Sequence, residues 1–224
     1  MGLGQQPLQE LHQVGALVPA VVGEVNAGEH HFLKTLGVGL FHLAGDRIQI
    51  QAAATAAGFR NDAKAAFEVV KKNHHQICLE LFGNETHEVF DKLQNIYAEV
   101  DWQLEEDRKE AYNYVYDQIV SQGELISSVI LSAYLNESGV QNTWLDVRDV
   151  MKTDDTYREA VVDWSKTQSL MDSIVKPVVK DSIIVTQGFI GCTPENCTTT
   201  LGREGSDYTA AIFANMLDAE HQTI

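Results

Sequence analysis

The sequence predicts an α/β fold, in which helices flank a mainly parallel central sheet. From about residue 62 onward, stretches with helical spacing of apolar residues alternate with short β-branched runs. The run 182–185 (SIIV) is continuously apolar or β-branched, as in strands that are buried in a parallel sheet. Glycine-bounded turns follow this run and precede the last helical stretch. Such turns lie where α/β sheets bind ligands, so both are candidate site elements.

Three helices are expected in the first part of this region. The first begins at a cap formed by Asn61 or Asp62 and ends at Gly83. The third runs from about Tyr112 to Tyr134 and is expected to be bent or interrupted at Gly123. The apolar residues that mark the first two helices are Phe67, Val70, Ile77 and Leu81, and then Val89, Leu93, Ile96 and Val100.

The remaining elements alternate between strand and helix. A short strand is expected at 143–147, and a helix at 161–179 that ends near Pro177. The strand 182–185 follows. Ser206 and Asp207 are expected to cap the last helix, with Ala211, Ala214 and Leu217 facing inward.

The chain divides into two parts near residue 61. Residues 1–61 hold nine of the 16 glycines and include a nearly low-complexity run at 52–58, without a sustained helical or alternating period. Two interpretations stay open: a set of short strands and turns, or a segment that arose from an altered reading frame. Residues 62–224 are expected to form one α/β domain.

Composition excludes some partners. The formal net charge of −16 disfavours binding to a nucleic-acid backbone or an anionic membrane, and the sequence has no apolar stretch of about 20 residues. Three cysteines suit a reducing compartment, so a cytoplasmic location is expected. Cys192 and Cys197 lack two further ligands at zinc-site spacing, and no metal site is expected.

The most informative segment is the run Thr198–Asp207, which leads from a loop into a helix. Its glycines permit close approach of a ligand to the backbone, the helix start offers N–H groups, and Arg203 offers a planar fork for a carboxylate or phosphate. The alternative is an ordinary turn with an acidic helix cap. The residues alone favour that alternative, because Ser, Thr and Asp are common at helix starts.

Four ordered segments resemble the catalytic domain of aspartokinases. TTTLGREGSDYTAA, from Thr198, is similar to the signature of that family's amino-acid-kinase domain. The segments 185–191 (VTQGFIG), 121–128 (SQGELISS) and 142–148 (NTWLDVR) resemble the preceding strand and turn, the start of the acidic substrate-recognition helix, and the intervening strand. The resemblance covers roughly residues 62–220 and implies a partial amino-acid-kinase-like fold.

The resemblance implies transfer of the γ-phosphoryl group of ATP to the side-chain carboxylate of L-aspartate, with Mg²⁺, as in lysine, threonine and methionine biosynthesis. Arg203 would bind a substrate carboxylate, Glu124 the substrate ammonium, and Ser206 the substrate or transferred group. Asp207 would organise the transfer geometry. Gly188, Gly191 and Gly205 would let the backbone approach the phosphates or the substrate.

The sequence also departs from the family pattern. The Lys-Phe-Gly-Gly-Thr-Ser loop that clamps phosphates in the family is not found, and Lys34–Gly39 differs from it in spacing. The nucleotide-binding turns and regulatory domains that would follow residue 224 are also absent. A non-catalytic fragment that retains part of the aspartate site is therefore the alternative, and a kinase for another amino acid is a third hypothesis. The family resemblance also implies a possible homo-oligomer.

Overall fold

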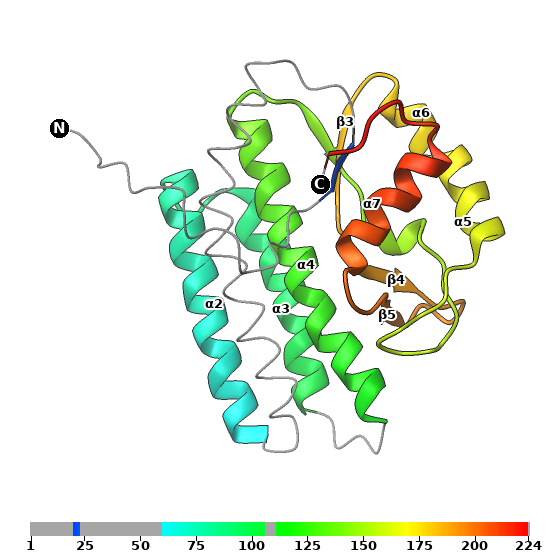
Figure 1. Ribbon diagram of the computed structural model, residues 1–224. Coiled ribbons are helices and arrows are strands. Elements are labelled where there is room, and N and C mark those ends of the chain that lie inside the picture. The colour runs from blue at the N-terminus through cyan, green and yellow to red at the C-terminus, as the bar shows by residue number, and fades with distance from the viewer. Residues whose placement is uncertain (1–19, 23–59, 106–110, 224) are drawn as a thin grey trace, which may run out of the picture.

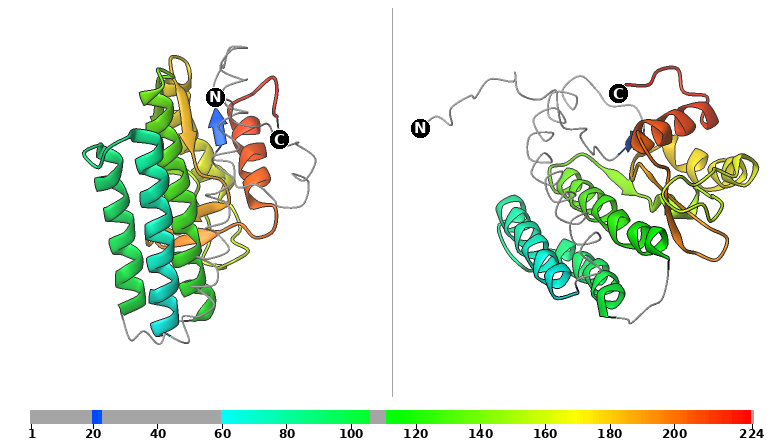
Figure 2. Two further views of the ribbon diagram at one scale, coloured as in Figure 1. Left: turned by 90° about the vertical axis from the view of Figure 1, so that its left-hand side faces the viewer. Right: turned by 60° about the horizontal axis from the view of Figure 1, so that its bottom comes forward.

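The computed structural model describes residues 20–22, 60–105 and 111–223. Helices lie on both sides of the strands, as Figure 1 and the right-hand view of Figure 2 show. The elements, in chain order, are β1 (Ala20–Val22), α2 (Arg60–Phe82), α3 (Glu88–Glu105), α4 (Tyr112–Glu137), β2 (Asn142–Trp144), a 3₁₀ turn (Val147–Asp149), α5 (Trp164–Leu170), a π turn (Met171–Val175), α6 (Lys176–Val179), β3 (Ile183–Thr186), β4 (Ile190–Cys192), β5 (Thr198–Thr200) and α7 (Gly205–Met216). This arrangement confirms the predicted α/β class.

Two small sheets lie between the helical layers. In the first, the strand order is β1-β3-β2; β2 pairs with β3 in parallel, with Thr143 opposite Ile184, whereas β1 pairs with β3 antiparallel. In the second, β4 and β5 form an antiparallel pair with Gly191 opposite Thr199. Among the described residues, the first sheet thus contains one parallel and one antiparallel pairing, both with β3, which corresponds to the predicted strand 182–185.

The three long helices form one layer, in which α3 packs against both α2 and α4. Their predicted apolar faces are largely confirmed: Phe67, Val70, Val89, Leu93 and Val100 are all buried. The first helix begins at Arg60, so the predicted cap residues lie inside it. None of the helices in the described part of the chain is both long and apolar enough to cross a membrane.

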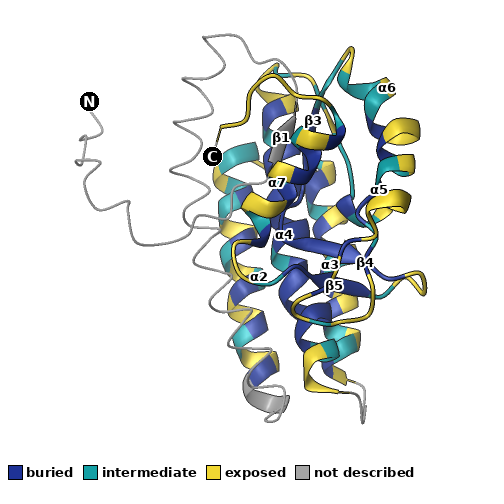
Figure 3. Ribbon diagram, turned by 45° about the vertical axis from the view of Figure 1, so that its right-hand side comes forward, coloured by how far each residue is buried: buried dark blue, intermediate teal, exposed yellow. Residues whose placement is uncertain are grey.

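Helix α4 is the central element of the molecule. It contacts α3 on one side and β2, β3 and β5 on the other, and most of its residues are buried (Figure 3). The predicted interruption at Gly123 is wrong, because α4 continues through this residue to Glu137. A glycine inside a helix costs only about 1 kcal/mol, which packing on both sides of α4 outweighs.

The region predicted as one helix at 161–179 consists of several parts. Helix α5 begins only at Trp164, where Asp163 accepts a hydrogen bond from the backbone N–H of Lys166 at 3.0 Å and caps the helix. The π turn then precedes Pro177, which has no N–H for a regular helical bond. The predicted strand 143–147 is also shorter, since β2 ends at Trp144.

Helix α7 differs from its prediction in start and orientation. Glu204 occupies the N-cap position, so Ser206 and Asp207 lie in the first turn and are not caps. Ala211 is exposed, whereas Ile212, Phe213 and Met216 are buried. The larger apolar side chains bury more area than alanines do, and they set the inward face of the helix.

Candidate functional site

The turn before β4 packs directly on the start of α7. A Cβ atom added to Gly188 would lie 2.9 Å from both Cα and Cβ of Ser206. A Cβ atom added to Gly205 would lie 2.7 Å from Cδ2 of Phe189. Only glycine permits such close contact at both positions. The structure therefore brings together three of the predicted site residues, Gly188, Gly205 and Ser206.

Phe189 completes this junction and was not identified from the sequence. Its backbone has a φ of 72°, which is unusual for a residue with a side chain. Its N–H donates to Oγ1 of Thr209 at 3.0 Å, and its carbonyl accepts from the N–H of Leu201 at 2.8 Å. These bonds connect the glycine turn to both β5 and α7. A phenylalanine after glycine gives no sequence signal of left-handed backbone.

The side chains that would meet an anion lie at the surface. The Arg203 side chain is 93% exposed, and its Nε lies 3.6 Å from Oε1 of Glu204. Glu204 has a φ of 57° and does not cap α7 with its side chain. Asp207 lies exposed in the first turn of the same helix. Because the Arg203 side chain is not packed against the protein, it can turn toward a ligand without breaking packing contacts.

Glu124 lies on α4, where only 3% of the residue is exposed. Asp117, Glu124 and Ser128 share one face of the helix, because they are separated by seven and four residues. The hydrogen bonds of the other two residues show which segments this face contacts, because Asp117 binds Thr200 of β5 and Ser128 binds Gln187, next to Gly188. Glu124 therefore lies on the strip of α4 that faces the segments carrying the Gly188 turn and β5.

Gly191 faces a different segment. A Cβ atom at this position would lie 2.7 Å from Cγ2 of Thr153 and 3.2 Å from the carbonyl oxygen of Met151. Its small size thus allows β4 to pack on residues 151–153. The predicted phosphate contact of Gly191 stays a prediction.

Two further residues of α4, Asp117 and Gln118, hold β5 in place. Oδ2 of Asp117 accepts from the N–H of Thr200 at 2.9 Å and from the N–H of Arg158 at 2.8 Å. Oδ1 of Asp117 accepts from Oγ1 of Thr200 at 2.8 Å. Gln118 donates to the carbonyl of Thr198 at 2.7 Å and accepts from its N–H at 3.2 Å. No sequence pattern indicates these contacts, and those to β5 join residues 80 and 83 positions apart.

Burial dominates the electrostatics of Asp117. The residue is 0% exposed, and this desolvation raises the pKa of its carboxyl group, opposed by the hydrogen bonds from Arg158 and Thr200. Nearby, Arg148 donates to both carboxylate oxygens of Asp146, at 3.0 and 3.1 Å from Nε. Burial acts to lower the pKa of Arg148, but the hydrogen bonds and the charge of Asp146 outweigh it and raise that pKa. The interior beside β5 is thus polar but internally satisfied.

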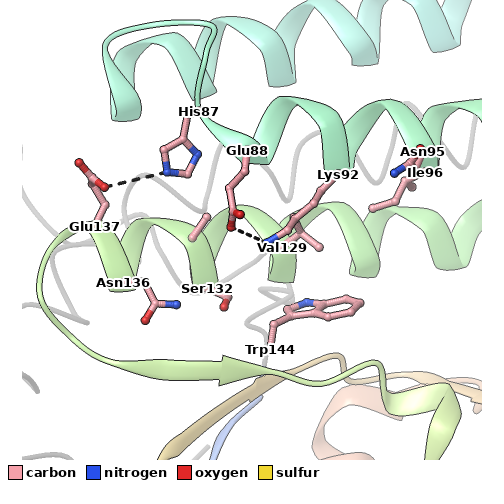
Figure 4. Close-up of a pocket in the computed structure, with 11 residues that line it drawn as sticks. His87, Glu88, Lys92, Asn95, Ile96, Val129, Ser132, Asn136, Glu137 and Trp144 are labelled. Carbon is pink, nitrogen blue, oxygen red and sulfur yellow. Dashed lines mark hydrogen bonds and ion pairs between the residues drawn. The ribbon is translucent and has the colours of Figure 1, made fainter.

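A separate cavity of about 430 Å³ lies between α3, α4 and β2 (Figure 4). Lys92 pairs with Glu88 at 2.6 Å, and His87 lies 4.0 Å from Glu137 at the other end. Ser132 donates to Asn142 at 2.6 Å. The cavity shares no lining residue with the predicted site, and much of its polar lining is already paired.

The thiols and acidic side chains of the described residues do not cluster as a metal centre would require. Cys78, Cys192 and Cys197 are free cysteines. Within the described ranges, no group of three or more His, Cys, Asp or Glu side chains is arranged to hold a metal ion. Gly188 and Phe189 are buried, so the side chains that are open to a ligand at this junction are the exposed ones of Arg203, Glu204 and Asp207.

Comparison with known proteins identifies the family. The family model described as "Amino acid kinase family" matches residues 44–224, which is most of the chain. The chain belongs to the amino acid kinase family. The match begins ahead of residue 62, where the resemblance was expected to begin.

Several aspartokinases are similar to this chain. Lysine-sensitive aspartokinase 3 of Escherichia coli is 43% identical over 108 residues, which is 48% of this chain and 24% of that protein. The aspartokinase of Chlamydia trachomatis is 27% identical over 160 residues, covering 71% of this chain and 35% of the relative. The chain thus spans about a quarter to a third of the length of these relatives.

Solved structures agree with this assignment. The crystal structure of E. coli aspartokinase III with lysine and aspartate superposes with a TM-score of 0.70 and 28% identity, over 80% of this chain and 39% of the other. The same enzyme in complex with aspartate and ADP gives the same values. The expected resemblance to aspartokinases and the expected amino-acid-kinase fold are confirmed.

Proposed function

We propose that this chain is part of an aspartokinase-type kinase domain that phosphorylates the side-chain carboxylate of L-aspartate with ATP. The observation that carries the proposal is the junction of the Gly188 turn with the Gly205–Ser206 start of α7, next to the α4 face that bears Glu124. A helix start with an exposed Arg203 suits an anionic substrate. The similarity to aspartokinases supports aspartate as that substrate.

Each predicted residue has a role in this proposal. Arg203 binds a carboxylate of aspartate, and Glu124 accepts hydrogen bonds from its ammonium group. Ser206 holds the substrate or the transferred group, and Asp207 orients the transfer. In the reaction, the bond between the γ-phosphorus and the β-γ bridging oxygen breaks while an aspartate carboxylate oxygen bonds to that phosphorus, giving ADP and aspartyl phosphate. Mg²⁺ would neutralise phosphate charge when bound.

The proposal includes a division of the chain into residues 1–61 and a partial amino-acid-kinase domain at 62–224. The family's Lys-Phe-Gly-Gly-Thr-Ser loop is not found in the sequence, and the Lys34–Gly39 stretch lies outside the described residues. A place in lysine, threonine and methionine biosynthesis, a homo-oligomeric state and a cytoplasmic location are part of the same proposal. The alternative is a chain that binds aspartate but does not transfer phosphate. That the family's phosphate-clamping lysine loop is not found in the sequence favours this alternative.

The test combines calorimetric titration with L-aspartate and L-glutamate and a coupled assay of ADP release. Arg203→Ala and Asp207→Ala are compared with Lys180→Ala and Asp181→Ala, which remove the same charges at exposed positions outside the proposed site. We expect aspartate binding that Arg203→Ala weakens about tenfold or more, or about 1.4 kcal/mol. If the native chain releases ADP in the presence of aspartate and Asp207→Ala abolishes this release, the kinase hypothesis is supported. Binding without turnover supports the alternative, and no aspartate binding by the native chain rejects both.

A further inference from the structure

The strand β5 leads directly into the candidate site. Thr200 is its last residue, and the run from Arg203 to Asp207, in which Arg203, Glu204 and Asp207 are exposed, follows within a few residues. Gly205 and Ser206 in this run pack on the Gly188–Phe189 turn, whereas Arg203 and Glu204 are exposed and Glu204 makes no side-chain cap. How β5 is held therefore helps to set the position of Arg203 and Glu204 relative to α4.

Helix α4 holds β5 through two consecutive side chains. Asp117 binds both the N–H and the hydroxyl of Thr200, and Gln118 binds both the N–H and the carbonyl of Thr198. Together they occupy the edge of β5 as a neighbouring strand would. All four residues are at most 8% exposed, so water does not compete well for these bonds.

Asp117 also fixes the loop that supports Gly202. Its Oδ2 accepts from the N–H of Arg158, a residue with a φ of 74°. The carbonyl of Arg158 would lie 3.1 Å from a Cβ atom at Gly202, and Ala160 donates to the carbonyl of Thr200 at 3.0 Å. One carboxylate thus joins α4, the 158–160 loop and the base of the 201–207 run.

Glu124 lies two helical turns from Asp117 on the same face of α4. We infer that Asp117 and Gln118 are positioning residues, which set the placement of the Arg203–Asp207 run relative to Glu124 by clamping β5 onto the helix that carries Glu124. The inference rests on the proposed function for the identity of the ligand. The clamp itself rests only on the contacts of Asp117 and Gln118.

A conservative substitution of Asp117 can separate the effect of its hydrogen bonds from the effect of its negative charge. In Asp117→Asn, the amide oxygen can take the place of Oδ2 and accept from both N–H groups, while the amide nitrogen donates to Oγ1 of Thr200. Asp117→Ala loses all three bonds. Ser132→Ala is the matched control, because it removes a partly buried hydrogen bond of 2.6 Å from the other end of α4.

The experiment measures backbone hydrogen exchange and aspartate affinity in the full chain. In Asp117→Ala we expect exchange in residues 198–207 and at Arg158 to rise at least about tenfold, with aspartate affinity about tenfold weaker. Asp117→Asn should restore both readouts. Ser132→Ala should leave both unchanged even if its melting temperature falls.

The outcomes are separable from those of the proposed function. The positioning role is overturned if backbone hydrogen exchange of residues 201–207 is unchanged in Asp117→Ala. It is also overturned if Asp117→Asn raises hydrogen exchange and weakens aspartate binding as much as Asp117→Ala does. If Asp117→Ala does not fold, Thr200→Val is used in its place, because it removes only the hydrogen bond from the Thr200 hydroxyl to Asp117. It should raise hydrogen exchange at the backbone N–H groups of residue 200 and Arg158, which donate to Asp117, by a smaller factor. No rise at these two groups also overturns the positioning role. If the native chain does not bind aspartate, the proposed function fails, while exchange still decides the clamp.

Discussion

At the scale of single residues, the candidate site tolerates unusual backbone. Phe189 and Glu204 both have positive φ values although they carry side chains. A left-handed conformation costs a residue with a Cβ atom roughly 1–2 kcal/mol. The two residues flank the contact between the Gly188 turn and α7, so strain and the candidate ligand site coincide, as is common where loops are held for binding.

Replacing Glu204 should separate this strain from charge. Glu204→Gly relieves the left-handed backbone and should stabilise the fold by about 1 kcal/mol, or about 2–4 °C in melting temperature. The lost ion pair with Arg203 matters little for stability, because both side chains are exposed. Glu204→Gln keeps the strain and should leave the melting temperature unchanged. Thermal denaturation of both variants checks this, and equal effects of the two changes would contradict it.

The thiols should differ in reactivity. Burial raises the pKa of Cys78 to about 12, and it also raises the pKa of Cys192. Cys197 is only half-buried. Because the thiolate is the reactive form, we expect one fast equivalent in a thiol-labelling assay of the folded chain and three in denaturant. Cys197→Ser should remove the fast equivalent; a second fast thiol in the native protein would contradict the burial of Cys78 and Cys192.

At the scale of elements, packing between the β4 turn and α7 defines the site. Gly188→Ala would place a Cβ atom 2.9 Å from the backbone of Ser206. We expect α7 to shift, with a loss of about 1–3 kcal/mol in stability and weaker aspartate binding. Gly139→Ala is the control: its φ of 88° adds strain, but nothing lies within 4 Å of the new atom. It should lower stability without changing affinity in calorimetry, and equal affinity loss in both would refute the packing argument.

The elements themselves were largely predictable from the sequence. The helical spacing of Val89, Leu93 and Val100 and the β-branched run before Thr186 reflect which side chains are buried, and burial is what the structure shows. The contact of Asp117 with Thr200 was not predictable, since it joins residues 83 apart through one carboxylate. Periodicity carries no information on such pairings. Likewise, Glu124 was predicted only from the family resemblance, and the local residues around Arg203 alone favoured an ordinary turn with a helix cap.

At the scale of the whole molecule, Gln187 connects three parts. It is 0% exposed at the end of β3, its amide oxygen accepts from the N–H of Val147 at 2.7 Å, and its amide nitrogen donates to Oγ of Ser128 on α4 at 2.6 Å. Ser128 also accepts from the indole of Trp144 at 2.9 Å. The helical layer of α4, strands β2 and β3, and the 3₁₀ turn are therefore joined by one side chain.

Gln187→Leu should weaken this connection across the whole fold. It leaves the buried N–H of Val147 without its acceptor, and Ser128 loses one of its donors. Each buried unsatisfied group costs about 1–3 kcal/mol, so we expect a loss of about 3 kcal/mol in urea unfolding. Gln76→Leu makes the same substitution on the surface of α2, where Gln76 donates an exposed hydrogen bond to Glu80, and should change stability by no more than about 0.5 kcal/mol. If both variants unfold at the same urea concentration as the native chain, Gln187 is not the junction between the layers. A larger loss in Gln187→Leu alone, seen equally by tryptophan fluorescence and by circular dichroism, would show that the helical layer and the sheet unfold as one cooperative unit through this residue.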